Sequence, residues 1–321
     1  MIPMANPESF PPPPSALAPE FCYRHPSEQT GVHCTRCNRP ICPECMLPAP
    51  VGYQCPECVG RSKREFAKGS GRRGVVAGAR RTTVSVTKVL IALNFAAFAI
   101  ELVVGGAGSL LQGPTVQQLV RLGGSVPYYP RPSGTVVGIA TGEYWRLFTS
   151  MFLHAGIIHI ALNMYGLWLF GRVLEDELGS LKMLAVYLMS GLAGGAFSFA
   201  FGSGAVGVGA SGAIYGLLGA FVAYNYRRRH MRFYRARLQA VMPWVILNIF
   251  LSFSISFIDW HAHVGGLVAG ALALYIAEGT GSPQTKRAIM VAGFLGLAAL
   301  TVALCIYGTA HWHTVVFGPR A

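Results

Sequence analysis

The chain has 321 residues, of which 52% are hydrophobic and only 12% are charged. Soluble domains carry about 25% charged residues, so this composition argues against a soluble protein and predicts an all-α membrane protein. The net charge is +13. Because the basic residues stand beside apolar stretches and not along one amphipathic face, they argue against nucleic acid as a partner.

Composition divides the chain into five predicted parts. Residues 1–20 are rich in proline and cannot bury a core, so we expect a disordered or polyproline tail. Residues 21–60 hold seven of the eight cysteines and predict a small metal-binding domain. A basic linker follows at 61–84, then an apolar domain at 85–308 and a C-terminal tail at 309–321.

Seven cysteines and one histidine of the second part form four pairs, each with two residues between its members. This spacing bends the chain so that both side chains face one ion, and four pairs suffice for two structural zinc ions. So short a segment has too little core to fold without metal. Disulfide bonds are the alternative for the cysteines, and His33 is the alternative to His25. The predicted ligands are Cys22, His25, Cys34, Cys37, Cys42, Cys45, Cys55 and Cys58.

Seven apolar runs follow, each near the length that crosses a bilayer as a helix. Lys and Arg gather in the linker and at 227–237. By the positive-inside rule, the N-terminus and the metal-binding domain lie in the cytoplasm and the C-terminus lies outside, which predicts a plasma-membrane protein. The reducing cytoplasm argues against disulfides, and the basic linker indicates contact with anionic membrane lipid. The runs cover about 87–107, 152–171, 182–202, 211–226, 239–257, 261–277 and 288–308.

Four polar side chains from three of these runs lie at a similar predicted depth. Counting about 1.5 Å per residue from the charged inner ends places Ser211, His263 and His159 about 24, 22 and 20 Å up. Asn163 stands one helical turn deeper than His159 on the same face. In a hydrocarbon core of about 30 Å, this level is below the outer surface. A serine and a histidine at one depth favour a nucleophile with its general base.

Small residues at four-residue spacing mark the faces on which two of these helices meet. They let the backbones approach closely, which brings Ser211 within reach of His263. The segment 202–209 before Ser211 is rich in glycine. Non-helical backbone at membrane depth is tolerated only when it is buried in protein or lines a water cavity, and hydrolysis needs water. The small residues are Gly212, Gly216 and Ala220 in one helix and Gly266 and Gly270 in the other.

Over about residues 85–308 the chain resembles the rhomboid family of intramembrane serine proteases. The resemblance implies a bundle of six core transmembrane helices plus one C-terminal helix. It also implies substrates that are transmembrane segments of other proteins, cleaved near the outer membrane face without a cofactor. The matching residues are Trp145 and Arg146, His154, His159 to Asn163, Gly209 to Gly212 with Tyr215, and Ala262 to Gly266 running to Gly270.

The resemblance also implies a role for each candidate site residue. Ser211 is the nucleophile, and His263 is its general base and then the general acid. His159, Asn163 and the backbone N–H of Ser211 donate to the oxyanion, with Tyr215 packed beside the His263 ring. The family works with a dyad, and Asp259, one turn before His263, is expected in the outer turn and not as a third member.

The cysteine-rich segment resembles B-box-type zinc fingers in its opening Cys-x2-His and in its spacing, although its last pair is Cys-Cys and not His-His. This resemblance favours a cross-brace in which alternate pairs share an ion, while the spacing itself leaves pairing of neighbours open. Such domains usually bind a protein partner. The cross-brace unites Cys22, His25, Cys42 and Cys45 on one ion and Cys34, Cys37, Cys55 and Cys58 on the other.

Other functions remain open at the level of sequence. One is a catalytically silent rhomboid-like protein that binds membrane clients; Ser211 and His263 argue against it. Another is a transporter, which would place a carboxylate at mid-depth, whereas Glu101 lies in the outer half of the first run. Ser211 could also merely pack helices, and His159 with Asn163 could be an interhelical hydrogen-bond pair.

Overall fold

The computed structural model divides the chain into two compact units, Met1–Thr83 and Val84–Ala321, here called the N-terminal unit and the helical unit. The predicted tail at 1–20 and the basic linker at 61–84 lie almost wholly outside the described residues, which are 19–49, 51–62, 64, 85–106 and 108–318.

The N-terminal unit has little regular structure. A two-stranded antiparallel ladder pairs β1 (Leu47–Pro48) with β2 (Tyr53–Gln54), next to the short 3-10 helix η2 (Pro43–Cys45). Its buried core consists of Ile41 and six of the cysteines, with Tyr23 and Met46 partly buried against them. Sulfur atoms therefore occupy the place of an apolar core.

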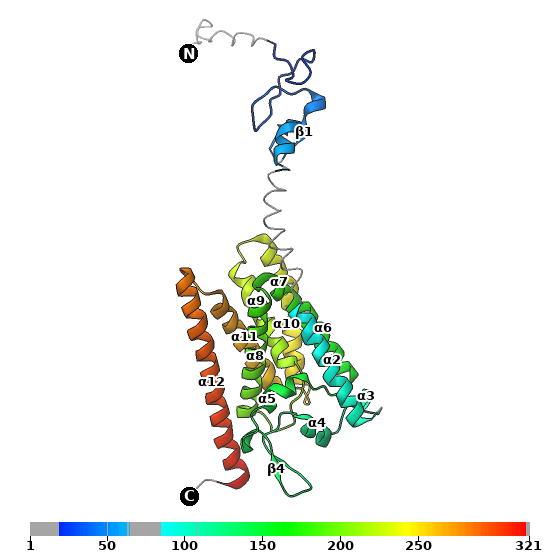
Figure 1. Ribbon diagram of the computed structural model, residues 1–321, viewed down its shortest axis with the longest axis vertical. Helices are drawn as coiled ribbons and strands as arrows, with labels where there is room; N and C mark the ends of the chain where they lie inside the picture. The colour runs from blue at the N-terminus through cyan, green and yellow to red at the C-terminus, as the bar shows by residue number, and fades with distance from the viewer. Residues whose placement is uncertain (1–18, 50, 63, 65–84, 107, 319–321) are drawn as a thin grey trace, which may run out of the picture. The chain divides into compact units, whose positions relative to one another are not determined.

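The helical unit is a bundle in which α8, α9 and α11 form the centre. Figure 1 shows α12 along one side of this bundle and α2 along the other. The helices are α2 (Val86–Gly105), α3 (Ser109–Gln112), α4 (Val116–Leu122), α5 (Arg146–Thr149), α6 (Ile157–Gly166), α7 (Arg172–Leu178), α8 (Ser180–Phe201), α9 (Ser211–Arg227), α10 (Arg232–Ser254), α11 (Trp260–Glu278) and α12 (Pro283–Phe317).

Between α4 and α6 the chain forms a compact loop with little regular structure. It contains the ladder of β3 (Tyr129–Pro130) with β4 (Val136–Val137) and the 3-10 turns η3 (Ile139–Thr141) and η4 (Ser150–Phe152). A π-helical turn, η5 (Leu167–Gly171), joins α6 to α7 in one continuous helix. This loop therefore leads directly into α6.

Six helices in the described part of the chain are long and apolar enough to cross a membrane: α2, α6 with α7, α8, α10, α11 and α12. The run predicted at 211–226 corresponds to α9, which has 17 residues and is mostly buried inside the bundle. The run predicted from 152 becomes α-helical only at Ile157, and Gly156, with a φ of 109°, is the N-cap of this helix.

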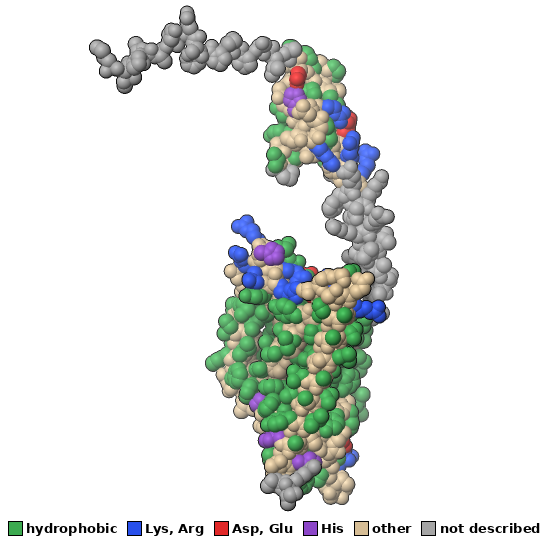
Figure 2. Space-filling view, turned by 90° about the vertical axis from the view of Figure 1, so that its left-hand side faces the viewer, with side chains coloured by type: hydrophobic (Ala, Val, Ile, Leu, Met, Phe, Trp, Pro, Cys, Tyr) green, Lys and Arg blue, Asp and Glu red, His purple; other side chains and the backbone are tan. Residues whose placement is uncertain are grey.

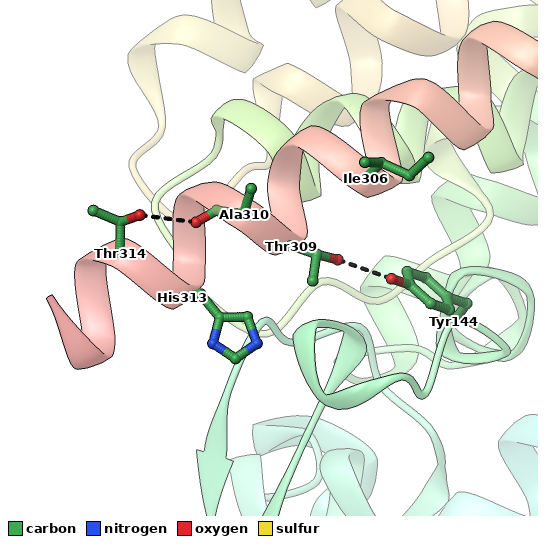
Figure 3. A pocket seen from close by; sticks show the side chains of 6 residues that line it. All are labelled: Tyr144, Ile306, Thr309, Ala310, His313 and Thr314. Atoms are coloured by element: carbon green, nitrogen blue, oxygen red, sulfur yellow. Dashed lines mark hydrogen bonds between the residues drawn. The ribbon is translucent and has the colours of Figure 1, made fainter. Parts of the chain in front are cut away.

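Helix α12 extends past 308, the predicted end of the last run, into the segment predicted as a tail. It continues to Phe317, since neither glycine nor proline occurs between Gly308 and Gly318. Its last turns also have partners: the Trp312 indole N–H donates to Phe199 O at 2.7 Å, and the hydroxyls of Thr309 and Tyr144 are 2.9 Å apart (Figure 3). His313 therefore lies on a helix that packs against the loop.

The backbones of α9 and α11 lie in direct contact at the centre of the bundle. A Cβ at Gly266 would overlap the carbonyl oxygen of Gly212, and a Cβ at Gly270 would overlap that of Gly216. The glycines predicted to let these two helices approach therefore do lie at their contact. Glycine is required here because any larger residue would push the backbones apart.

We expect Gly270→Ala to destabilise the protein by about 1–3 kcal/mol, the usual effect of overpacking a close contact. Its matched control is Gly296→Ala in α12, where a Cβ would meet nothing within 4 Å. Thermal unfolding in detergent compares the two variants. Equal midpoints for both would contradict the role given to the α9–α11 contact.

Candidate active site

Ser211 and His263 lie in hydrogen-bond contact between α9 and α11. Ser211 is the first residue of α9, and His263 lies in the first turn of α11. The Ser211 Oγ and His263 Nε2 atoms are 2.9 Å apart. Tyr215, one turn into α9, stacks on the imidazole with ring centres 3.9 Å apart and planes 11° from parallel. The geometry suits proton transfer from a serine hydroxyl to an imidazole.

His159 stands beside the backbone that leads into α9. Gly209 has a φ of 119°, and a Cβ there would lie 2.8 Å from His159 Cε1 and 2.9 Å from its Nε2. The Ala155 N–H donates to His159 Nδ1 at 3.1 Å, so a neutral ring carries its proton on Nε2. That proton faces the segment preceding Ser211. Gly209 is needed both for its backbone conformation and for the room it leaves to the ring.

Asn163 lies one turn after His159 in α6, as predicted from their spacing. Its Nδ2 donates to His159 O at 2.8 Å, and its Oδ1 is buried without a hydrogen-bond partner among the described residues. One of the two amide N–H donors is therefore used within α6, and the other is available for a further acceptor.

The loop before α6 is held by a carboxylate that sequence reasoning assigned no role. Glu101 of α2 is fully buried, and both of its oxygens accept the His154 N–H, at 3.0 and 3.1 Å. The Glu101 carboxylate thus accepts a hydrogen bond from the protein's own backbone. This is a structural role, whereas a transporter would need an intramembrane carboxylate to bind an ion. His154 itself is fully buried next to the His159 ring.

Arg146 fixes the loop backbone. The side chain is 1% exposed; Nη1 donates to Val120 O and Gly124 O at 2.8 and 3.1 Å, and Nε pairs with Glu143 at 2.6 Å. Carbonyl groups of a loop at this depth have few water partners, so a buried guanidinium satisfies several of them at once.

Asp259 is the N-cap residue of α11. Its side chain accepts the Ala262 N–H at 3.1 Å and the Ser198 hydroxyl at 2.5 Å, which caps the helix. The second ring nitrogen of His263 instead meets Ser252 of α10, a residue that the sequence did not single out; the Nδ1 and Oγ atoms are 2.8 Å apart.

The eight predicted metal ligands form two clusters in the N-terminal unit, and all eight cysteines of the chain are free. In each cluster the candidate ligand atoms lie within 4.8 Å of one another. A tetrahedral ion with Zn–S bonds of about 2.3 Å separates its sulfurs by about 3.8 Å, and the Cys37 and Cys55 sulfurs are 3.8 Å apart. The clusters are Cys22, His25, Cys42 and Cys45, and Cys34, Cys37, Cys55 and Cys58.

This arrangement joins alternate pairs, the order that the cross-brace prediction gave. His33 lies elsewhere, paired with Glu20 at 2.5 Å. His25 Nδ1 is 3.1 Å from the Cys42 sulfur and 3.6 Å from the Cys45 sulfur. The donor sets, seven thiols and one imidazole, are those that zinc prefers.

Each cluster combines an easily ionised thiol with a resistant one. Burial raises the pKa of Cys22, but hydrogen bonds from backbone N–H groups outweigh it and lower the pKa to about 6; the same balance holds for Cys34, also at about 6. Burial and contact with neighbouring thiols raise the pKa of Cys45 to about 11 and that of Cys58 to about 12. A cation would relieve this crowding of negative charge.

Known proteins match the helical unit. A family model for the Rhomboid domain covers residues 141–279. Rhomboid protease GluP of Bacillus subtilis is 38% identical over 176 residues, which are 53% of this chain and 33% of that protein. RHOMBOID-like protein 6, mitochondrial, of Arabidopsis thaliana is 37% identical over 131 residues, 40% of this chain and 42% of the relative. The chain therefore spans less than half the length of these two relatives.

A shorter relative decides the family. "Putative rhomboid protease YdcA" of Bacillus subtilis is 34% identical over 145 residues, which make up 72% of that protein and 45% of this chain. The chain belongs to the rhomboid family. Together with its apolar helices, this makes it a multi-pass membrane protein. The rhomboid match contains Ser211, His263, His159 and Asn163, whereas the cysteine clusters lie outside it.

Proposed function

We propose that this rhomboid is an intramembrane serine endopeptidase that cleaves transmembrane segments of other membrane proteins near the outer face of the membrane. The contact between Ser211 Oγ and His263 Nε2, at 2.9 Å, carries the proposal. Two relatives with the word protease in their names support it. No cofactor is needed, because a serine and its base provide both the nucleophile and the proton transfer.

In the proposed reaction, Ser211 Oγ attacks the scissile carbonyl carbon while His263 takes the hydroxyl proton at Nε2. The negative charge that develops on the carbonyl oxygen is stabilised by the backbone N–H of Ser211, by His159 and by Asn163. His263 then gives its proton to the leaving amine as the C–N bond breaks. Water hydrolyses the remaining ester in the same two steps and releases Ser211.

We expect Ser211→Ala and His263→Ala each to abolish cleavage of a transmembrane substrate in liposomes, because one removes the nucleophile and the other its base. His261→Ala is the matched control, since this ring stacks on Trp260 in the same turn of α11. A fluorophosphonate probe should label wild type at Ser211. Cleavage that survives either substitution contradicts the dyad. A folded wild type that neither cleaves nor reacts with the probe favours a silent, client-binding rhomboid.

Asn163→Ala should lower kcat by about 100-fold with little change in KM, because an oxyanion donor acts mainly in the transition state. Asn225→Ala is the control: Asn225 is also buried and also donates to a carbonyl one turn earlier, Phe221 O at 2.7 Å. It lies about 21 Å along α9 from Ser211 at about 1.5 Å per residue. An unchanged kcat with a raised KM would move Asn163 from the oxyanion to substrate binding.

The proposed orientation puts the N-terminus in the cytoplasm of a plasma-membrane protein and the C-terminus outside. Figure 2 shows Lys and Arg side chains gathered at one end of the helical unit. At the C-terminal ends of α9 and α11, Arg227 and Arg228 pair with Glu278 at 3.4 and 2.5 Å. This basic end supports the orientation by the positive-inside rule, and it suits contact with anionic lipid headgroups.

For the N-terminal unit we propose two structural zinc ions, one in each cysteine cluster, in a B-box-like cross-brace that binds a protein partner. The ligand atoms of each cluster lie within 4.8 Å of one another, and this clustering supports it together with the low pKa of Cys22 and Cys34. Since the candidate catalytic residues all belong to the helical unit, the N-terminal unit would serve recruitment or regulation.

Zinc loading of the metal-stripped chain at pH 7.5 should release protons, at least one per ion. Cys45 and Cys58 have pKa values above this pH and are protonated without metal, whereas zinc binds the thiolate. Metal analysis and a pH-indicator titration measure both quantities. Cys22→Ser should cost one ion and Cys34→Ser the other. A native chain without zinc, or one variant that loses both ions, would contradict two independent sites.

A further inference from the structure

Ser252 of α10 occupies the side of the His263 ring that faces away from Ser211. Its Oγ is 2.8 Å from His263 Nδ1 and 2.8 Å from the hydroxyl oxygen of Tyr215. Ser252 is 3% exposed, and its hydroxyl also donates to Asn248 O, one turn earlier in α10, at 2.8 Å. The imidazole is thus held at both nitrogens and on one face by three different side chains.

If His263 is a base, its hydrogen-bond partners determine which ring nitrogen carries the proton and what Ser252 must accept. For Nε2 to take the Ser211 proton, its lone pair must be free, so the proton of the neutral ring must sit on Nδ1. An Nδ1–H needs an acceptor. The Ser252 Oγ can accept it while the Ser252 proton goes to Asn248 O, and Tyr215 can donate to the same Oγ. Every donor in this chain then has an acceptor.

We propose that Ser252 is a positioning residue for His263: it selects the Nδ1–H tautomer and stabilises the imidazolium that forms when Ser211 is deprotonated. The proposal rests on the proposed protease function. In other serine hydrolases a carboxylate fills this position, but the nearby Asp259 is committed to the start of α11. A neutral hydroxyl is a weaker acceptor than a carboxylate, and it leaves no unpaired charge in the bilayer.

The contact between Ser252 and His263 also connects the proposed general base to α10. This helix is the least buried of the six long apolar helices described, with 11% of its most apolar stretch inside the bundle. The Ser252 hydroxyl contacts His263 and Tyr215, and so connects α10 to α11 and α9, the two helices that carry the candidate dyad. Displacement of α10 would therefore remove the Ser252 contact to His263.

The test compares Ser252→Ala, Ser252→Thr and the control Ser254→Ala in the full chain. Ser254 lies in the same helix and makes the same bond to a carbonyl one turn earlier, Phe250 O at 2.8 Å, but is exposed. Steady-state cleavage gives kcat and KM. The rate of fluorophosphonate labelling at Ser211 reports activation of the nucleophile without a protein substrate. Thermal unfolding separates loss of folded protein from loss of reactivity.

Ser252→Ala should lower kcat about tenfold, equivalent to about 1.4 kcal/mol, and slow labelling by a similar factor with KM unchanged. Ser252→Thr should restore most of both rates, because it keeps the hydroxyl, and Ser254→Ala should match wild type. Equal kcat and labelling rates for Ser252→Ala and wild type overturn the proposal. So does a loss that disappears once rates are corrected for the folded fraction, since that loss comes from packing alone.

The tautomer can be measured without any activity. The chain is labelled with 15N-histidine, and the nitrogen chemical shifts of His263 are assigned by their disappearance in His263→Ala. They should show the proton on Nδ1 in wild type and a mixture of the Nδ1–H and Nε2–H tautomers in Ser252→Ala. A proton on Nε2 in wild type overturns the role of Ser252. If wild type shows Nδ1–H but neither cleaves nor labels, the proposed protease function fails and the hydrogen bond to Ser252 stands as a structural contact.

Discussion

Close contact between the backbones of α9 and α11 is the constraint on which the candidate site depends. Gly266 and Gly270 lie directly against the carbonyl groups of Gly212 and Gly216, so no side chain separates the two helices. Because Ser211 opens α9 and His263 lies in the first turn of α11, this approach brings their side chains together. Lipid gives no hydrophobic drive for helices to associate, so backbone packing and interhelical hydrogen bonds must hold them.

Ionisable side chains fix the elements around this pair by bonding to hydroxyl groups and to backbone atoms. Glu175 accepts from the Ser85, Thr87 and Ser180 hydroxyls, which ties the start of α2 to α7 and α8. Glu101 holds the loop before α6, and Arg146 holds the loop before α5. A backbone group left without a partner in hydrocarbon costs several kcal/mol by the general rule, so these few side chains decide where the irregular segments can lie. One of these irregular segments leads into α6, the regular helix that carries His159 and Asn163.

Features governed by helix geometry could be predicted from the sequence, and those governed by helix rotation could not. The fixed rise per residue sufficed to place Ser211 and His263 at one depth, and the four-residue spacing of glycines indicated the face on which they meet. Ser252 was missed because its use depends on which face of α10 turns toward His263. The end of α12 was missed because hydropathy falls after Gly308 while Trp312 still bonds to Phe199 O. The role of Glu101 was missed because its partner is the backbone N–H of His154 in a loop, and no sequence pattern predicts such a contact.

The two units depend on different sources of stability. Apolar residues of six long helices and interlocking glycines hold the helical unit, whereas Ile41 and six cysteines make up the buried core of the N-terminal unit. A core of thiols gains less from burial than one of leucines, and the three or four sulfur ligands of a cluster, when ionised, repel one another unless a cation lies between them. If zinc fills both clusters, as proposed, the fold of the N-terminal unit follows the metal supply, while the contact between Ser211 and His263 depends on the helical unit alone.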